Sequence, residues 1–116
     1  MDTNTLEKFL ESFKAAERSF PFGPEALVFK VMGKMFALES QGEETPRVTL
    51  KCDPVDAANL VDQFASIVPG YYMNKKHWVT ISLTGEVPEE MILDLAGESY
   101  RLVVGTLSKK HRQELI

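Results

Sequence analysis

Two runs of the chain alternate apolar and polar residues with a period of two, and this alternation constrains the fold more than any other feature. Residues 47–51 place Val48 and Leu50 on one side and three polar residues on the other. Residues 77–83 repeat the pattern, with Trp78 on the side opposite the aliphatic residues. Successive side chains of a strand point to opposite faces, so each run predicts a strand that buries only one of its faces.

A second pair of runs predicts a β-hairpin. Residues 27–31 and 34–38 are rich in apolar side chains and are separated by two residues, the second of which is Gly33. Glycine adopts positive φ readily, as tight hairpin turns require. A two-residue loop and a type I turn with a glycine bulge both fit this spacing. The bulged register would place Lys30 and Lys34 near each other on one face, and the sequence leaves the choice open.

Three segments have apolar residues at the spacing of an α-helix. The first covers residues 6–16, and Asn4 is its expected N-terminal cap. The second covers residues 54–67, with Asp53 as the cap and a proline at the first helical position. The third covers residues 88–107 and is followed by four basic residues that suit the C-terminal end of a helix.

Together these elements predict an α+β fold in the order α-β-β-β-α-β-α. A length of 116 residues is the size of one domain, and two halves of this chain would be too small to bury adequate cores. We therefore expect one compact domain over residues 1–116, with a mostly antiparallel sheet and helices packed on one side.

The composition indicates a cytoplasmic protein that does not contact a membrane. No apolar stretch approaches the roughly 20 residues needed to cross a bilayer. The N-terminus lacks the basic and apolar regions of a signal peptide. A single cysteine, Cys52, excludes an internal disulfide and a Cys-rich metal site, which fits a reducing compartment.

Charge is distributed unevenly along the chain. The net charge is −4, but residues 27–38, 47–52 and 68–85 contain six basic residues and no acidic one. These six residues are Lys30, Lys34, Arg47, Lys51, Lys75 and Lys76. Because the three segments are also the predicted strands and their turns, an exposed sheet face would be positive on an acidic protein. The alternative is that the lysines only discourage edge-to-edge pairing of strands.

No group of residues in the sequence predicts catalysis. Cys52 lies between a predicted strand and a helix cap, which is typical of a small packed residue. His77 and His111 lack the spacing of metal ligands and have no cluster of Cys or carboxylate residues nearby. We therefore expect a protein without catalytic activity, bound metal or cofactor.

Residues 71–78 combine three aromatic side chains with two lysines and His77. Aromatic rings stack on bases and lysines neutralise phosphates, so this combination is typical of nucleic-acid contact. The predicted contact residues are Lys30, Lys34, Lys51, Tyr72, Lys75, Lys76, His77 and Trp78. So few cations on an acidic protein predict weak, salt-sensitive binding, with DNA as the partner. The alternative is that Trp78 and one tyrosine pack in the core while the lysines only solubilise a loop.

Several blocks of the sequence occur in the order and at the spacing of a known family. They are SFPFGP at 19–24, VFKV at 28–31, GKMFAL at 33–38, LKCDP at 50–54, PGYYMNKKHW at 69–78 and SYRLVV at 99–104. Through them the chain, from Leu6 to Arg112, resembles the MmcQ/YjbR family. The resemblance implies a compact α+β domain of double-wing architecture that is proposed to bind DNA. It also implies a small bacterial cytoplasmic protein with no demonstrated enzymatic activity. The family's motif positions map to Lys30, Lys34, Lys51, Lys75, Lys76, His77 and Trp78.

Two other functions fit the same sequence. A protein-interaction module, chaperone-like in character, would present the sheet face or an edge strand to an acidic or extended partner. A domain that binds small anionic metabolites would place His77 and the lysines around a phosphate group. A pull-down that returns one protein partner even after nuclease treatment would favour the first alternative. Thermal stabilisation by one nucleotide or phosphorylated metabolite would favour the second.

Overall fold

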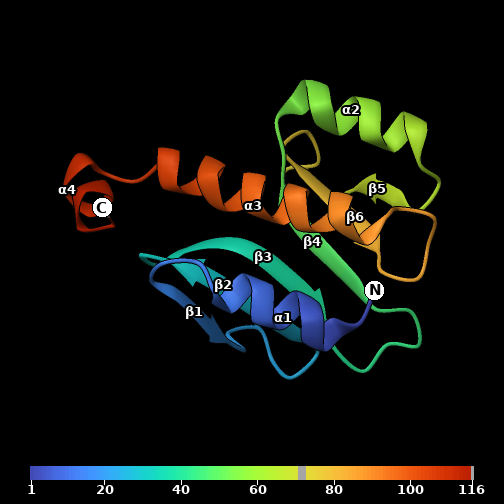
Figure 1. The fold of residues 1–116 in the computed structure, drawn as a ribbon, viewed down its shortest axis with the longest axis horizontal. Helices are drawn as coiled ribbons and strands as arrows, with labels where there is room; N and C mark the ends of the chain where they lie inside the picture. The colour runs from blue at the N-terminus through green and yellow to red at the C-terminus, as the bar shows by residue number, and fades with distance from the viewer. Residues whose placement is uncertain (71–72, 116) are drawn as a thin grey trace.

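The computed structural model describes residues 1–70 and 73–115. This part of the chain contains a sheet of six antiparallel strands and four helices (Figure 1). The strands lie in the order β1-β2-β3-β4-β6-β5. The elements are α1 (Thr3–Glu11), β1 (Ala16–Ser19), β2 (Ala26–Val31), β3 (Lys34–Ser40), β4 (Arg47–Lys51), α2 (Pro54–Gln63), β5 (Ile67–Pro69), β6 (Trp78–Ser82), α3 (Glu89–Gly105) and α4 (Lys109–Glu114). The predicted α+β class and antiparallel sheet are confirmed.

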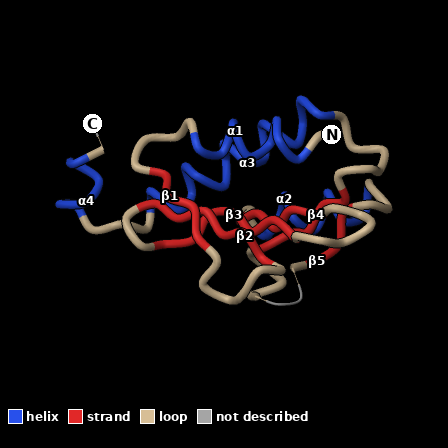
Figure 2. Tube along the Cα trace, turned by 90° about the horizontal axis from the view of Figure 1, so that it is seen from below, coloured by secondary structure: helices blue, strands red, loops and turns tan. Residues whose placement is uncertain are grey.

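One face of the sheet packs against α1 and α3, which lie together on that side (Figure 2). The strand residues that point to this helix side are buried: Leu27, Phe29, Val48, Leu50, Val79 and Ile81. The predicted inward orientation of Val48 and Leu50 is therefore confirmed. We call the opposite side the outer face. The register places Val28, Leu38, Thr49 and Thr80 in one row across it.

The predicted order of elements was incomplete at the N-terminal end. The first helix was expected over residues 6–16, but α1 ends at Glu11, and residues 16–19 form β1. Ala15 has a φ of 61° in the turn after the helix, directly before β1 begins. The cap is Asp2 rather than Asn4, since an Asp2 carboxylate oxygen accepts the backbone N–H of Asn4 at 3.3 Å.

Two further elements were missed because apolar residues continued a helical spacing beyond the end of the helix. The second helix was expected over residues 54–67, but α2 ends at Gln63 and β5 follows. The third was expected over residues 88–107, but α3 ends at Gly105. The basic residues after it form α4, whose N-cap Ser108 accepts the backbone N–H of His111 at 3.2 Å. The start of α2 is as predicted, with Asp53 capping the helix.

The structure settles the hairpin geometry that the sequence left open. Met32 and Gly33 have φ values of 50° and 82°, so the loop has two residues, both with positive φ. Val31 and Lys34 face each other directly across this turn. Because Val31 points to the helix side and Lys30 to the outer face, Lys34 and Lys30 lie on opposite sides of the sheet.

A buried hydroxyl joins α3 to two strands. β3 has one extra residue, Phe36, in its pairing with β2, and direct pairing of β3 with β4 runs from Glu39 to Ala37. Beyond that point Ser99 accepts the backbone N–H of Lys51 at 2.8 Å and donates to the carbonyl of Phe36 at 2.6 Å. Ser99 is fully buried. Its hydroxyl therefore satisfies two main-chain groups at the bulge and fixes α3 over β3 and β4.

A second buried polar residue, Glu39, lies on the helix side of β3. It has no exposed surface, and one oxygen accepts the Gln41 side-chain amide at 3.2 Å. Burial raises the pKa of Glu39 to about 8, and the neighbouring Glu7 carboxylate adds to the rise. Arg18 lies 3.3 Å from that Glu7 carboxylate (Nη2 to Oε1). The Glu39 carboxyl is therefore protonated at neutral pH, which removes the cost of a buried negative charge.

We predict that Ser99→Ala lowers the free energy of unfolding by about 1–3 kcal/mol, because it leaves a buried N–H and a buried carbonyl without partners. Urea unfolding followed by circular dichroism measures the change. Ser19→Ala is the control, since Ser19 is exposed in β1 and should change stability by less than about 0.5 kcal/mol. Equal stability of both variants would contradict the bridging role.

We predict that stability falls as pH rises from about 4.5 to about 8, because folded Glu39 keeps a proton that the unfolded chain releases in this window. The slope from this one group reaches about 1.4 kcal/mol per pH unit. Glu39→Gln should remove this contribution. The free energy of unfolding of the variant, relative to that of the parent, should therefore be higher at about pH 8.5 than at about pH 5. Urea unfolding at both pH values tests this, with exposed Glu44→Gln as control. Parallel pH profiles for Glu39→Gln and the parent would contradict it.

Candidate nucleic-acid interface

The structure separates the six predicted strand cations into three groups. Lys34 lies on the helix side, where its Nζ donates to the carbonyl of Thr106 at 3.0 Å and to its hydroxyl at 3.3 Å. Thr106 is the C-cap of α3, where carbonyl groups lack helical partners and favour a cation. Lys34 therefore stabilises the end of a helix, away from the other cations.

Lys30 and Arg47 lie on the outer face, each beside a carboxylate. Lys30 is directly opposite Glu17 in the pairing of β2 with β1. Arg47 forms an ion pair with Glu43, with 2.5 Å between Nη2 and Oε2. Carboxylate neighbours reduce the positive potential that a phosphate would meet. These two residues therefore contribute less to an anion site than their strand positions indicated.

The remaining cations lie at the end of β4 and before the start of β6. Lys51 pairs directly with Trp78, and Lys75 and Lys76 lie in the loop that leads into Trp78. The backbone carbonyl of His77 accepts the N–H of Cys52 at 2.7 Å, which holds this loop against the end of β4. We call the five residues Lys51, Lys75, Lys76, His77 and Trp78 the cationic corner. Within the described residues, none of its lysines forms an ion pair, whereas Arg18, Arg47 and Arg101 all do.

A local turn positions the two loop lysines. The side-chain oxygen of Asn74 accepts the backbone N–H of Lys76 at 3.0 Å, and the Asn74 carbonyl accepts that of His77. This is the way in which asparagine side chains stabilise tight turns. The predicted stacking residue Tyr72 and its neighbour Tyr71 lie outside the described residues.

Trp78 is half-buried and lies on the outer face, as its position in the alternating run predicted. Among the described residues, the core cluster does not include Trp78. The core position that the alternative gave to Trp78 is therefore not observed, and the role that it gave to the lysines stays a prediction. Gly70 lies against it: its N–H donates to the Trp78 carbonyl at 2.8 Å, and a Cβ at residue 70 would come within 2.7 Å of the Trp78 Cβ. Glycine is thus needed for β5 to approach the tryptophan.

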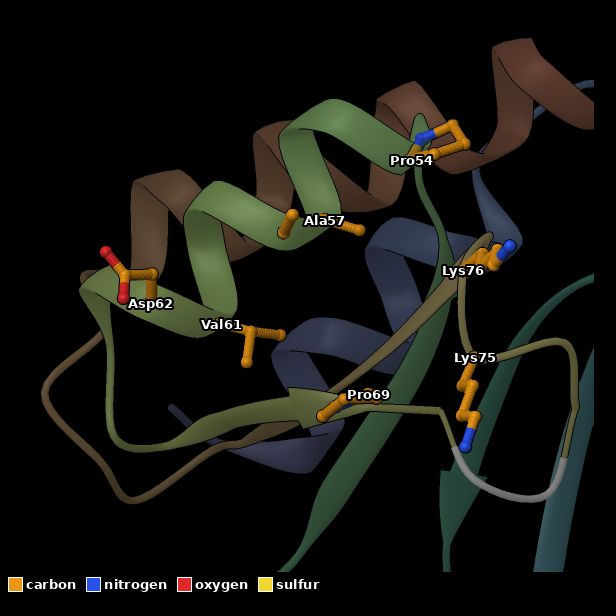
Figure 3. A pocket seen from close by; sticks show the side chains of 8 residues that line it. Pro54, Ala57, Val61, Asp62, Pro69, Lys75 and Lys76 are labelled. Atoms are coloured by element: carbon orange, nitrogen blue, oxygen red, sulfur yellow. The ribbon is translucent and has the colours of Figure 1, made fainter.

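A cavity of about 670 Å³ adjoins the cationic corner. It lies between α2, β5 and the lysine loop, and Figure 3 shows Lys75 and Lys76 on that loop with their ammonium nitrogens pointing in different directions. Pro54, Ala57, Ala58, Val61, Asp62 and Pro69 complete its lining. Its lining is thus mainly apolar, with two lysines and one aspartate.

The comparisons with known proteins agree with this fold. The YjbR family model matches residues 11–102. The chain belongs to the YjbR family. Its YjbR relatives include uncharacterized protein YbdF of Escherichia coli O157:H7, 40% identical over 111 residues that make up 96% of this chain and 91% of that protein. Uncharacterized protein YjbR of Escherichia coli K12 is 31% identical over 116 residues, 100% of this chain and 98% of that protein.

A solved structure has the same YjbR-type fold. The crystal structure of Deinococcus radiodurans protein DR2400, a DUF419 domain, aligns with a TM-score of 0.91 and 39% identity over 97% of this chain and 86% of that one. A Pseudomonas syringae protein aligns with a TM-score of 0.76 at 23% identity, over 88% of this chain and 98% of that one. The second likeness concerns the fold.

Sequence reasoning missed a second concave site of this YjbR family domain, on the outer face. A cavity of about 450 Å³ lies over β3, β4 and β6, with the outward residues Leu38, Thr49 and Thr80 among its lining. The alternating pattern placed Thr49 and Thr80 outward, but only the strand order places them side by side. Phe22 also lines this cavity and is 67% exposed. The exposure of one aromatic side chain cannot be predicted from the sequence pattern.

Neither a metal cluster nor a membrane span is found in the described part of this YjbR family domain. Residues 1–70 and 73–115 contain no group of three or more His, Cys, Asp or Glu side chains that could hold a metal ion. No helix among them is both long and apolar enough to cross a bilayer.

We predict that Cys52 of this YjbR family domain resists alkylation in the folded state. Burial raises the pKa of its thiol to about 11, and the carboxylates of Asp56, Asp53 and Glu98 add to the rise. The thiolate is the reactive form, so little of it is present at about pH 8. Iodoacetamide labelling followed by mass spectrometry should modify the urea-unfolded chain and leave the native chain unmodified. Rapid labelling of both would contradict this prediction.

Proposed function

We propose that this protein is a cytoplasmic, non-catalytic domain that binds nucleic acid, DNA in particular, weakly through the cationic corner. The observation that supports this most is the gathering of Lys51, Lys75 and Lys76 beside Trp78 without carboxylate partners among the described residues. Free ammonium groups on one surface can neutralise successive phosphates, whereas paired ones must first lose their partners. The family resemblance, with its double-wing proposal for DNA, supports the same partner.

In this proposal the three lysines contact phosphates, and Trp78 stacks on or wedges against a base or sugar. His77 adds a ring and a hydrogen-bonding nitrogen next to them. Binding is weak because only three phosphates are neutralised and the whole protein is negative at −4. It is also weak in sequence preference, because lysine–phosphate contacts position a duplex without reading its bases.

A second candidate function rests on the cavity between α2 and the lysine loop. Lys75 and Lys76 line it together with mainly apolar residues. A small phosphorylated metabolite with an apolar portion would therefore fit it. Inorganic phosphate and adenosine monophosphate distinguish this candidate from the first. Binding of adenosine monophosphate with higher affinity than a short DNA strand would favour the metabolite.

We predict that fluorescence anisotropy with labelled duplex and single-stranded DNA shows binding at low salt that fades as salt rises. Three phosphate contacts give a slope of log K against log salt of about −2 to −3. The double variant Lys75→Glu/Lys76→Glu should lose most of the affinity and leave a slope no steeper than about −1.

The matched control is Lys109→Glu/Lys110→Glu, which makes the same change of net charge in exposed residues of α4. It should bind DNA more tightly than the corner variant by at least about tenfold if the corner is the site. No binding at low salt, or an equal loss in both double variants, would refute the proposal.

A further inference from the structure

The cavity on the outer face has the construction of a small-molecule site. Its floor is formed by side chains of three neighbouring strands, among them Met35, Leu38 and Thr80. The loop between β1 and β2 contributes Phe22 on one side, and the loop before β6 contributes Met73 on another. A sheet face enclosed by loops on two sides admits a compact molecule more readily than the flat surface of a protein partner.

The floor of this cavity contains a pair of hydroxyl groups. The side-chain oxygens of Thr49 and Thr80 lie 2.8 Å apart, facing each other across β4 and β6. Thr49 is buried, with 7% of its surface exposed. One hydroxyl donates to the other, so one O–H donor and several lone pairs remain for a ligand. Polar atoms placed in an otherwise apolar cavity orient what binds there.

The rim of the cavity has an excess of negative charge. Glu25, Glu43 and Arg47 line it, and Arg47 is already paired with Glu43. Glu25 is exposed and forms no ion pair in the part of the chain that the structure describes. A positively charged ligand would therefore be attracted here, and an anionic one repelled.

The apolar lining fits a cationic or aromatic ligand. Phe22 lines the cavity and is 67% exposed overall, so its ring is available to receive a cation or to stack on another ring. Met35 and Met73 provide flexible thioether side chains that adapt to aromatic groups. When a ligand removes such large apolar side chains from water, the free energy of the complex is lowered.

We infer that this outer-face cavity binds a small aromatic amine, whose ring lies between Phe22, Met35 and Leu38 and whose ammonium group lies near Glu25. The Thr49–Thr80 hydroxyls hydrogen-bond to a polar atom of the ring system. The site contains none of the lysines of the cationic corner and prefers the opposite charge. It therefore stands independently of nucleic-acid binding.

Three indole compounds with the same ring and different charge test the inference: tryptamine, 3-methylindole and indole-3-acetate. Titration of the full chain, followed by amide chemical shifts in NMR spectra, should perturb Leu38, Thr49 and Thr80 with tryptamine. We expect tryptamine to bind roughly two- to fivefold more tightly than 3-methylindole, the gain of a cation near a ring and a carboxylate. Indole-3-acetate should bind most weakly.

Two variants separate the ring contact from the charge contact. Ala26→Phe adds a ring at a cavity-lining position and should abolish binding of tryptamine and 3-methylindole alike. Glu25→Gln should keep 3-methylindole binding and reduce the preference for tryptamine over it, leaving only the contribution of the Phe22 ring. Val55→Phe is the matched control, since it adds the same ring to an exposed position of α2 outside the cavity lining and should leave both affinities unchanged. If Ala26→Phe does not fold, Thr80→Val removes a floor hydroxyl at nearly constant volume and should weaken tryptamine binding.

Shifts confined to the cavity, with the affinity order cation, neutral compound, anion, would support the inference. Absence of shifts with all three compounds, or shifts at the cationic corner instead, would overturn it. Equal affinity for the three compounds would overturn it as well, because the charge of Glu25 would then have no effect. Loss of DNA binding in the corner variant with unchanged tryptamine binding shows that the two sites are separate.

Discussion

Burial of one side of the sheet under α1 and α3 is the constraint on which the other features depend. Leu27, Phe29, Leu50 and Val79 must point to the helix side, and the period of two then decides what every neighbouring residue does. A shift of one residue in any strand would expose these side chains. The constraint reaches the main chain too, because α3 lies close enough to β3 and β4 for the Ser99 hydroxyl to replace missing strand pairing at the bulge.

The same constraint distributes charge. A cation on a strand lies on the outer face or the helix side according to its register, and its neighbours then decide whether it is free. Lys34 is directed toward Thr106 at the end of α3, whereas Arg47 pairs with Glu43. The cations that remain available are Lys51 at the end of β4 and the two lysines of the loop before β6. An acidic protein can thus present a small positive surface, and a negative cavity rim a short distance along the same face.

Much of the fold could be predicted from local patterns, because local physical chemistry decides it. Residues 47–51 form a strand with the predicted orientation, and Asp53 caps α2 through its own side chain. The errors have one cause. Phe13 and Ile67 continue a helical spacing of apolar residues. Phe13 nevertheless lies in the turn after α1, where its ring stacks on Tyr100 of α3. Ile67 belongs to the edge strand β5, which pairs with β6. Spacing records that a residue is buried, and several backbone paths bury it equally well.

The sequence by itself determined the secondary-structure class, the orientation of the alternating strands and the family, since these follow from nearest neighbours and short motifs. Only the tertiary structure decided which distant residues meet. Lys51 lies beside Trp78, Thr49 beside Thr80 and Glu39 beneath α1 because strands far apart in the chain pair in one register. Those contacts depend on strand order, and the positive φ of Met32 and Gly33 in the same way decides that Lys30 and Lys34 lie on opposite sides of the sheet. Neither is encoded in the spacing of apolar residues, because that spacing is the same for every strand order.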